Sequence, residues 1–345
     1  MRKLLTSLVA FMPGAALADV QAVASFSILG DLVSVVGGNH VTVTNLVGAD
    51  EDAHVYSPTA ADARAVASAD IVFFNGLEFE GWSANLLAAS ETSAPIITIG
   101  ENLPLILDAD SEVVEGDMDH DDDHEMGEES HEGHKDEHHD DHEDEHHDED
   151  AHEDEHHDDH SDDPHGHDHG EFDPHVWNSV CNVMEIVHII EHELSEIDPA
   201  NAAAYEANAD AYMSELSDLQ AGFQTRIDAI PAGARNVVTT HDAFGYLGAE
   251  MGLTFLAPQG LNSETEASAA EVRDLIVQLR TLPNAAIFVE NIINPALIEQ
   301  IASETGFGVA GTLYSDALSG PDGPARTYLE QYSYNLESIL SELEN

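Results

Sequence analysis

Three histidines and one aspartate stand where polar side chains could meet at the ends of strands. His54 follows an apolar, β-rich run at 41–47, His175 directly precedes a helical segment, and His241 ends the run VVTTH. Asp316 follows a similar run at 309–314. Ligand sites in open α/β sheets form at the carboxyl ends of the strands. Three imidazoles and one carboxylate form a tetrahedral donor set suited to Zn²⁺, whereas Ca²⁺ and Mg²⁺ prefer oxygen ligands.

A second concentration of histidine lies in a segment that is otherwise almost wholly acidic. Sixteen of the 22 histidines fall within 120–169, and 32 acidic residues lie within 108–171 against one base, Lys135. With so few apolar side chains, the segment 108–171 cannot offset the entropy of ordering, and we expect a disordered loop. Because imidazole and carboxylate both bind zinc, the loop is predicted to collect zinc at several weak, exchangeable sites, with a solvated spacer as the alternative.

The stretch HIIEH at 188–192 indicates a different chemistry. It matches the H-x-x-E-H signature, in which His188 and His192 would share a zinc ion and Glu191 would act as a base. Apolar residues on the same predicted helix explain the two histidines equally well as flanking residues. Cys181 lies inside this helix, and the chain has no Gly-x-Ser-x-Gly motif and no phosphate-binding glycine loop. We therefore predict that the protein is not an enzyme, with a zinc metallopeptidase as an alternative.

The segments that must position these residues alternate between strand-like and helix-like patterns. Strands are expected at 20–25, 41–47, 70–76 and 96–99, and again at 236–240, 253–257, 285–291 and 309–314. Such alternation predicts βαβ units and parallel sheets. The stretch 198–231 is rich in Ala, Glu and Leu and predicts one long helix. We therefore expect an α/β fold with two Rossmann-like lobes, 19–197 and 232–345, joined by a linking helix at 198–231.

The N-terminus and the overall charge indicate an exported protein. Residues 1–18 combine Arg2 and Lys3, an apolar run and the sequence Ala-Leu-Ala, which together predict a secretory signal peptide. The formal net charge of -60 disfavours nucleic acid and anionic membrane surfaces as partners and attracts cations. Cys181 is the only cysteine, so it forms no internal disulfide and is not a lipid-anchor cysteine at a mature N-terminus. We expect a soluble periplasmic protein.

Five stretches in order resemble the periplasmic metal-binding proteins that serve zinc or manganese ABC transporters, a family whose zinc members include the ZnuA and AztC types. The stretches are HVYSPTAAD around His54, DPHVW around His175, THDAFGYL around His241, FVENIINPALIEQIASETG, and LYSDALS around Asp316. The resemblance spans nearly the whole mature chain. It implies two α/β lobes with a rigid long helix between them and a metal ion held between the lobes.

The resemblance also implies specific roles. It makes His54, His175, His241 and Asp316 the metal ligands, with Glu51 or Asp52 as a neighbouring or alternative carboxylate. Manganese members usually carry Glu at the position of His241, so the resemblance favours Zn²⁺ over Mn²⁺ as the transported ligand. Zinc members often carry a His-rich loop before the second ligand, as this chain does. The implied partner is the inner-membrane permease of an ABC transporter, the expected state is a monomer, and a zinc buffer or metallochaperone is a further alternative.

Overall fold

The computed structural model describes residues 20–103, 105–107, 113–115 and 172–344. The predicted signal peptide at 1–18 lies outside these residues, and so does most of the predicted loop at 108–171. Within that loop range, Val113–Glu115 forms a strand, β6, which pairs antiparallel with β5, Leu105–Leu107. This hairpin was not predicted, because a two-residue apolar run among acidic residues gives almost no periodicity.

The first lobe is built on a four-stranded parallel sheet with the order β2-β1-β3-β4. Its elements are β1 Val20–Ala24, α1 Ser27–Gly37, β2 Val41–Asn45, α2 Ala60–Ala67, β3 Ile71–Phe74, α3 Ser83–Ser90 and β4 Ile96–Thr98. All four residues of β3 are buried, as expected for a central strand covered on both faces. Thr59 caps α2 by accepting hydrogen bonds from the backbone of Ala61 and Asp62, which fixes where this helix begins.

The second lobe repeats the arrangement of the first. Its elements are β7 Asn236–Val238, α6 Gly245–Met251, β8 Thr254–Leu256, α7 Ala269–Leu279, β9 Ala286–Glu290, α8 Ala296–Thr305 and β10 Val309–Leu313. The sheet is parallel with the order β10-β9-β7-β8. Counted from the first strand of each lobe, both sheets have the order 2-1-3-4. In this topology, α7 and α8 are the counterparts of α2 and α3.

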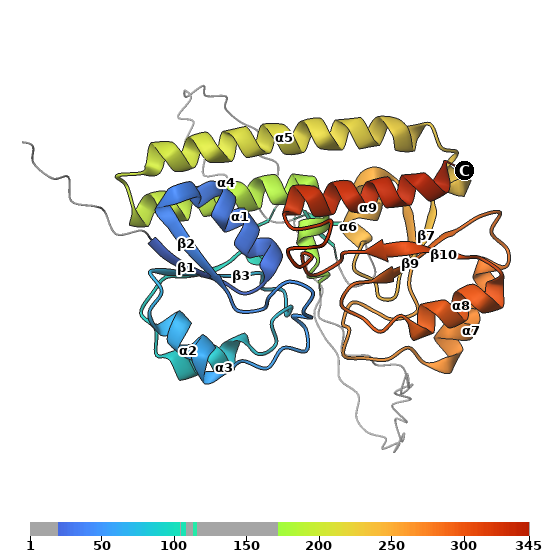
Figure 1. Ribbon diagram of the computed structural model, residues 1–345, viewed down its shortest axis with the longest axis horizontal. Coiled ribbons are helices and arrows are strands. Elements are labelled where there is room, and N and C mark those ends of the chain that lie inside the picture. Colours follow the sequence, from blue (N-terminus) through green and yellow to red (C-terminus); the bar gives the residue numbers. More distant parts are fainter. Residues whose placement is uncertain (1–19, 104, 108–112, 116–171, 345) are drawn as a thin grey trace, which may run out of the picture. The chain divides into compact units, whose positions relative to one another are not determined.

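The long helix α5 runs across both lobes, and the helices α4 and α9 pack against it (Figure 1). Helix α4, Val180–Ile197, is capped by the Ser179 side chain. It buries an apolar stripe made of Val183, Ile186, Val187, Ile190 and Leu194. The 27-residue helix α5, Ala202–Asp228, packs on α1 and α4 of the first lobe and on α9, Tyr328–Leu343, of the second. The long helix predicted within 198–231 is therefore present, and the predicted α/β fold with two parallel-sheet lobes is confirmed.

The last helix, α9, begins at Tyr328, where the Thr327 side chain accepts a hydrogen bond from the backbone of Glu330. The preceding residues form a turn in which the backbone N–H of Gly323 donates to the Gly320 carbonyl. Across the described residues, no helix is long and apolar enough to cross a membrane.

Candidate metal centre

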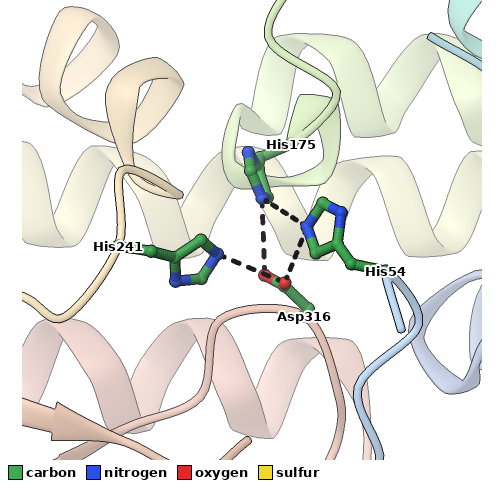
Figure 2. A group of neighbouring side chains, drawn as sticks. All are labelled: His54, His175, His241 and Asp316. Carbon is green, nitrogen blue, oxygen red and sulfur yellow. Dashed lines mark hydrogen bonds and ion pairs between the residues drawn. The ribbon is translucent and has the colours of Figure 1, made fainter. Parts of the chain in front are cut away.

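Four of the residues singled out in the sequence meet in one place (Figure 2). His54, His175, His241 and Asp316, here called the four-residue cluster, each offer a ligand atom within 4.8 Å of the others. The Nε2 atoms of His54 and His241 lie 3.4 and 3.3 Å from Asp316 Oδ2, and His175 Nε2 lies 3.7 Å from Oδ1. His54 is 7% exposed, and the other three are fully buried. The sequence positions therefore converge as the strand-end argument predicts.

The loop after β2 carries His54 into this position. The Asp52 carboxylate accepts a hydrogen bond from the His54 backbone N–H at 2.9 Å and another from the Ser263 hydroxyl at 2.7 Å. The indole N–H of Trp82 donates to the Ala53 carbonyl at 2.8 Å. Asp52 thus orients the His54 backbone and also binds a residue of the second lobe. The Glu51 carboxylate accepts from the Gly48 backbone, so both acidic neighbours of His54 are used in shaping the loop.

His175 lies just before α4 and is held by a buried carboxylate. Asp173 Oδ1 lies 2.7 Å from the Nδ1 of His175 and also accepts from its backbone N–H at 2.9 Å. The Asn75 amide, at the end of β3, donates to the Pro174 carbonyl at 2.9 Å. A carboxylate on Nδ1 keeps the proton there, so Nε2 presents its lone pair toward the cluster.

His241 follows β7 and has the equivalent support from β9. Glu290, the last residue of β9, places Oε2 at 2.6 Å from His241 Nδ1. The other oxygen, Oε1, accepts from the backbone of Thr240 at 2.7 Å and of His241 at 2.9 Å. One buried carboxylate therefore fixes both the backbone and the ring of this histidine.

Asp316 is supplied by the loop after β10, which is anchored through its backbone. The Ser315 carbonyl accepts from the indole N–H of Trp177 at 2.9 Å, and the Leu318 N–H donates to the Ser27 hydroxyl at 3.0 Å. Both carboxylate oxygens of Asp316 are buried, and the imidazole Nε2 atoms of the three histidines lie 3.3, 3.4 and 3.7 Å from them. A buried carboxylate is unfavourable unless a positive charge compensates it.

The cluster strongly shifts the protonation of two of its members. Burial raises the pKa of Asp316, but attraction to His241 and His175 outweighs burial and holds that pKa well below its usual value. Burial lowers the pKa of His241, but the negative charges of Glu290 and Asp316 dominate and hold the pKa of this imidazole well above its usual value. Without metal, a proton on His241 therefore neutralises part of the buried negative charge.

The donor set fits a divalent cation. Three Nε2 atoms and a carboxylate point toward one another, and two of the imidazoles have a carboxylate on the opposite ring nitrogen, as metal-binding histidines usually do. Within the described part of the chain, this is the one group of three or more His, Cys, Asp or Glu residues close enough to share an ion.

The residues of the alternative motif lie elsewhere. The side chain of His188 is 64% exposed on α4, and its Nδ1 is 3.9 Å from Glu191 Oε2. Glu191 Oε1 accepts a hydrogen bond from the Ser195 hydroxyl. Cys181 is exposed near the start of α4, and the ring of His40 packs against Tyr205. None of these residues belongs to the four-residue cluster.

Sequence reasoning missed the two carboxylates that hold the imidazoles. Asp173 lies two residues before His175, and Glu290 lies in the quoted stretch FVENIINP, but neither was assigned a role. An acidic residue closing an otherwise buried strand such as β9 is the signal that could have identified Glu290, since buried carboxylates require partners.

The chain is similar to known metal-binding proteins over almost its whole length. The family described as ZnuA, zinc-uptake complex component A, periplasmic, matches residues 22–342. The manganese-binding lipoprotein MntA of Halalkalibacterium halodurans is 28% identical over 321 residues, covering 93% of this chain and 87% of MntA. The iron-binding protein YfeA of Yersinia pestis is 26% identical over 318 residues, covering 92% and 84%. A manganese-bound periplasmic metal-binding protein from Candidatus Liberibacter asiaticus superposes with a TM-score of 0.71 at 28% identity, covering 94% and 100%.

Proposed function

The chain belongs to the ZnuA family of periplasmic zinc-uptake components, and on that premise we propose that it captures Zn²⁺ between its lobes and delivers it to an ABC permease. The family consists of metal-binding components of ABC transporters rather than enzymes. The transported ion is a substrate that the protein binds and releases. The function therefore requires a site that holds a divalent cation and can also let it go.

The observation that carries the proposal is the buried carboxylate of Asp316, which is surrounded by three imidazole Nε2 atoms. We assign His54, His175, His241 and Asp316 as the ligands. His54 and His175 lie in the proposed first lobe, 19–197, whereas His241 and Asp316 lie in the proposed second lobe, 232–345. A cation bound by all four would join the lobes, with the linking helix within 198–231 as the fixed element.

Zinc is favoured over manganese by the chemistry of the donors. Three nitrogen ligands and one carboxylate suit tetrahedral Zn²⁺, while Mn²⁺ favours oxygen-rich octahedral sites. A site of given composition also binds Zn²⁺ more tightly than Mn²⁺ in the Irving–Williams order. Relatives named for manganese and iron are similar over 93% and 92% of this chain, so the choice of metal rests on the ligand set of this chain.

Capture and release are coupled to protons. Zinc binds the neutral imidazole, so the proton held by His241 must leave when the ion enters. His54 lacks a carboxylate on its Nδ1 among the described residues, and it is the least buried of the four ligands. We propose that His54 is the first ligand to detach on release. The His-rich segment 108–171 is proposed to act as an accessory collector in the periplasm, and the protein to act as a monomer.

A metal competition experiment tests the proposal. Metal-free protein is titrated with Zn²⁺ and with Mn²⁺ against a chelator of known affinity, and the bound metal is measured by mass spectrometry of the intact complex. We expect one tight zinc site and binding of Mn²⁺ at least about 100-fold weaker, from the stability order of the two ions. Tighter binding of Mn²⁺ than of Zn²⁺ would contradict the assignment of zinc as the transported ion. It would not contradict the proposal that the protein delivers a metal ion.

A further inference from the structure

The side chain of Phe79 lies against two members of the four-residue cluster. Its ring centroid is 4.7 Å from that of His54 and 6.2 Å from that of His175, and both pairs of rings meet edge to face. Phe79 is 1% exposed, and it lies on the segment that joins β3 to α3 in the first lobe. The ring therefore forms part of the immediate surroundings of the candidate metal centre without supplying a ligand atom.

Two further aromatic rings extend this contact into a layer. The ring centroids of Phe26 and Trp177 lie 5.0 and 4.8 Å from that of Phe79, and Trp177 lies 5.4 Å from the ring of His175. The indole N–H of Trp177 already donates to the Ser315 carbonyl at 2.9 Å. Phenyl rings carry no hydrogen-bonding group, so these three rings, here called the aromatic layer, offer a water molecule no strong hydrogen-bond partner.

The turn that carries Phe79 has an unfavourable backbone conformation. Gly76, Leu77 and Glu78 have φ angles of 82°, 53° and 62°, in the left-handed region that residues other than glycine rarely adopt. A Cβ atom on Gly76 would lie 2.3 Å from the Thr98 side chain, so only glycine fits there. Strained residues of this kind persist only where the surrounding structure fixes them, and they are concentrated at functional sites.

The buried carboxylate of Glu80 fixes this turn. Its Oε1 accepts a hydrogen bond from the Asn75 backbone N–H at 2.8 Å, and its Oε2 accepts one from Gly76 at 3.0 Å. The backbone N–H of Phe79 donates to the Gly76 carbonyl at 3.1 Å. Glu80 is 4% exposed. The turn is therefore held from within the first lobe, and it keeps the Phe79 ring against the two imidazoles.

An apolar surface beside a metal site affects Zn²⁺ and Mn²⁺ differently. The four-residue cluster supplies four donors, which complete a tetrahedral set for Zn²⁺. Mn²⁺ favours six ligands in an octahedral arrangement, so in this site it would need additional oxygen ligands from water. A bound water molecule needs hydrogen-bond partners of its own. The aromatic layer provides none beside His54 and His175.

We propose that Phe79 is a specificity-determining residue, which excludes from the four-residue cluster the water ligands that Mn²⁺ requires. This inference rests on the proposed zinc function and assigns part of the selectivity to a residue that binds no metal. Exclusion of water has little effect on Zn²⁺, because the four protein ligands already complete its coordination. The strained turn and the buried Glu80 keep the ring in the position where it excludes water.

The test compares two substitutions of nearly equal size in the full chain. Phe79→Asn and Phe79→Leu both remove the ring, but only asparagine can form hydrogen bonds with a water molecule. The affinities for Zn²⁺ and Mn²⁺ are measured by chelator competition. In Phe79→Asn the preference for Zn²⁺ over Mn²⁺ should fall by about 10-fold, as for other residues that surround metal ligands. In Phe79→Leu it should change by less than about 3-fold, because an apolar side chain still excludes water.

The visible spectrum of bound Co²⁺ gives an independent measure of the number of ligands. Four-coordinate Co²⁺ absorbs visible light much more strongly than five- or six-coordinate Co²⁺, since geometry controls the spectrum of this ion. We expect strong absorption in the unchanged protein and in Phe79→Leu, and weaker absorption in Phe79→Asn. Phe223→Asn is the control for lost stability, because this buried ring of α5 packs against Tyr332. It should keep both the spectrum and the metal preference.

Each outcome decides between water exclusion and a purely structural role of the ring. Equal changes in Phe79→Asn and Phe79→Leu would overturn the proposal, because the loss of the ring would then matter and the entry of water would not. An unchanged zinc preference in Phe79→Asn, with folding confirmed by a thermal melt, would also overturn it. If that variant does not fold, the Co²⁺ spectrum of the unchanged protein decides: strong absorption supports a site without water ligands, and weak absorption contradicts it.

Failure of this inference can be distinguished from failure of the proposed function. If the unchanged protein binds Mn²⁺ more tightly than Zn²⁺, the proposed zinc function is wrong, and the specificity role of Phe79 is wrong with it. If the unchanged protein prefers Zn²⁺ and Phe79→Asn keeps that preference, only the role of Phe79 is wrong. A preference for Zn²⁺ that is reduced in Phe79→Asn alone supports both.

Discussion

The four-residue cluster and the pair His188 and His192 offer similar donors in different surroundings. The cluster is buried, and carboxylates orient two of its imidazoles. On α4, the side chain of His188 is 64% exposed, and the nearest carboxylate is 3.9 Å away. In the cluster, most of the desolvation and ordering that metal binding requires has already occurred in the folded protein. Buried supporting carboxylates therefore distinguish the candidate metal centre from the pair on α4, which only matches a short sequence motif.

Removing a proposed ligand from the four-residue cluster should have the largest effect on zinc affinity. His241→Ala should weaken zinc binding by more than about 100-fold, beyond the effect of losing a supporting carboxylate. It also leaves Asp316 with one fewer partner in a buried site. Chelator competition measures the affinity, and a thermal melt of the metal-free variant confirms that it folds. Unchanged affinity in a folded variant would exclude this centre.

Removing only the carboxylate that supports His241 should have an intermediate effect on zinc affinity. Glu290→Gln keeps an oxygen for the backbone of Thr240 and His241 but loses the negative charge at His241 Nδ1. We expect zinc binding about 10- to 100-fold weaker, as for other outer carboxylates of metal sites. The same titration checks this value. Wild-type affinity would mean that Glu290 shapes the backbone alone.

Proton release gives a third test. The pKa of His241 lies well above its usual value in the metal-free protein, while Asp316 stays ionised because its pKa is well below its usual value. Raising the pH toward the folded pKa of His241 removes the competing proton, so zinc affinity should rise by about 10-fold per pH unit and then level off. Calorimetry in buffers of different ionisation enthalpy should detect about one proton released per zinc near pH 7. No release would show that His241 is already neutral there.

The smallest effect is expected on α4. The double variant His188→Ala and His192→Ala should change the tight zinc affinity by less than about 2-fold and alter stability little, because these side chains are exposed. A peptidase assay on the same protein tests the alternative reading of the motif. Loss of tight zinc binding in this variant would show that the histidines on α4, and not those of the four-residue cluster alone, hold the ion.

The fold of the two lobes and the convergence of the four cluster residues could be predicted from the sequence, whereas the side chains that support the cluster could not. Periodicity located the strands that became β1–β4 and β7–β10, and strand ends located His54, His241 and Asp316. The hairpin β5–β6 and the roles of Asp173 and Glu290 were not predicted. These features depend on which residues meet after folding, as when Glu290 on β9 reaches the backbone after β7. Local patterns do not encode such tertiary pairings, whereas they do encode helix and strand periodicity.

The central claim is that the four-residue cluster, and not the His-rich segment, is the transport site. The most direct measurement is a competitive zinc titration by calorimetry on the full chain and on a chain lacking residues 116–169. We predict that one tight site survives the deletion while the weaker sites disappear. Loss of the tight site together with the segment would contradict the assignment of His54, His175, His241 and Asp316.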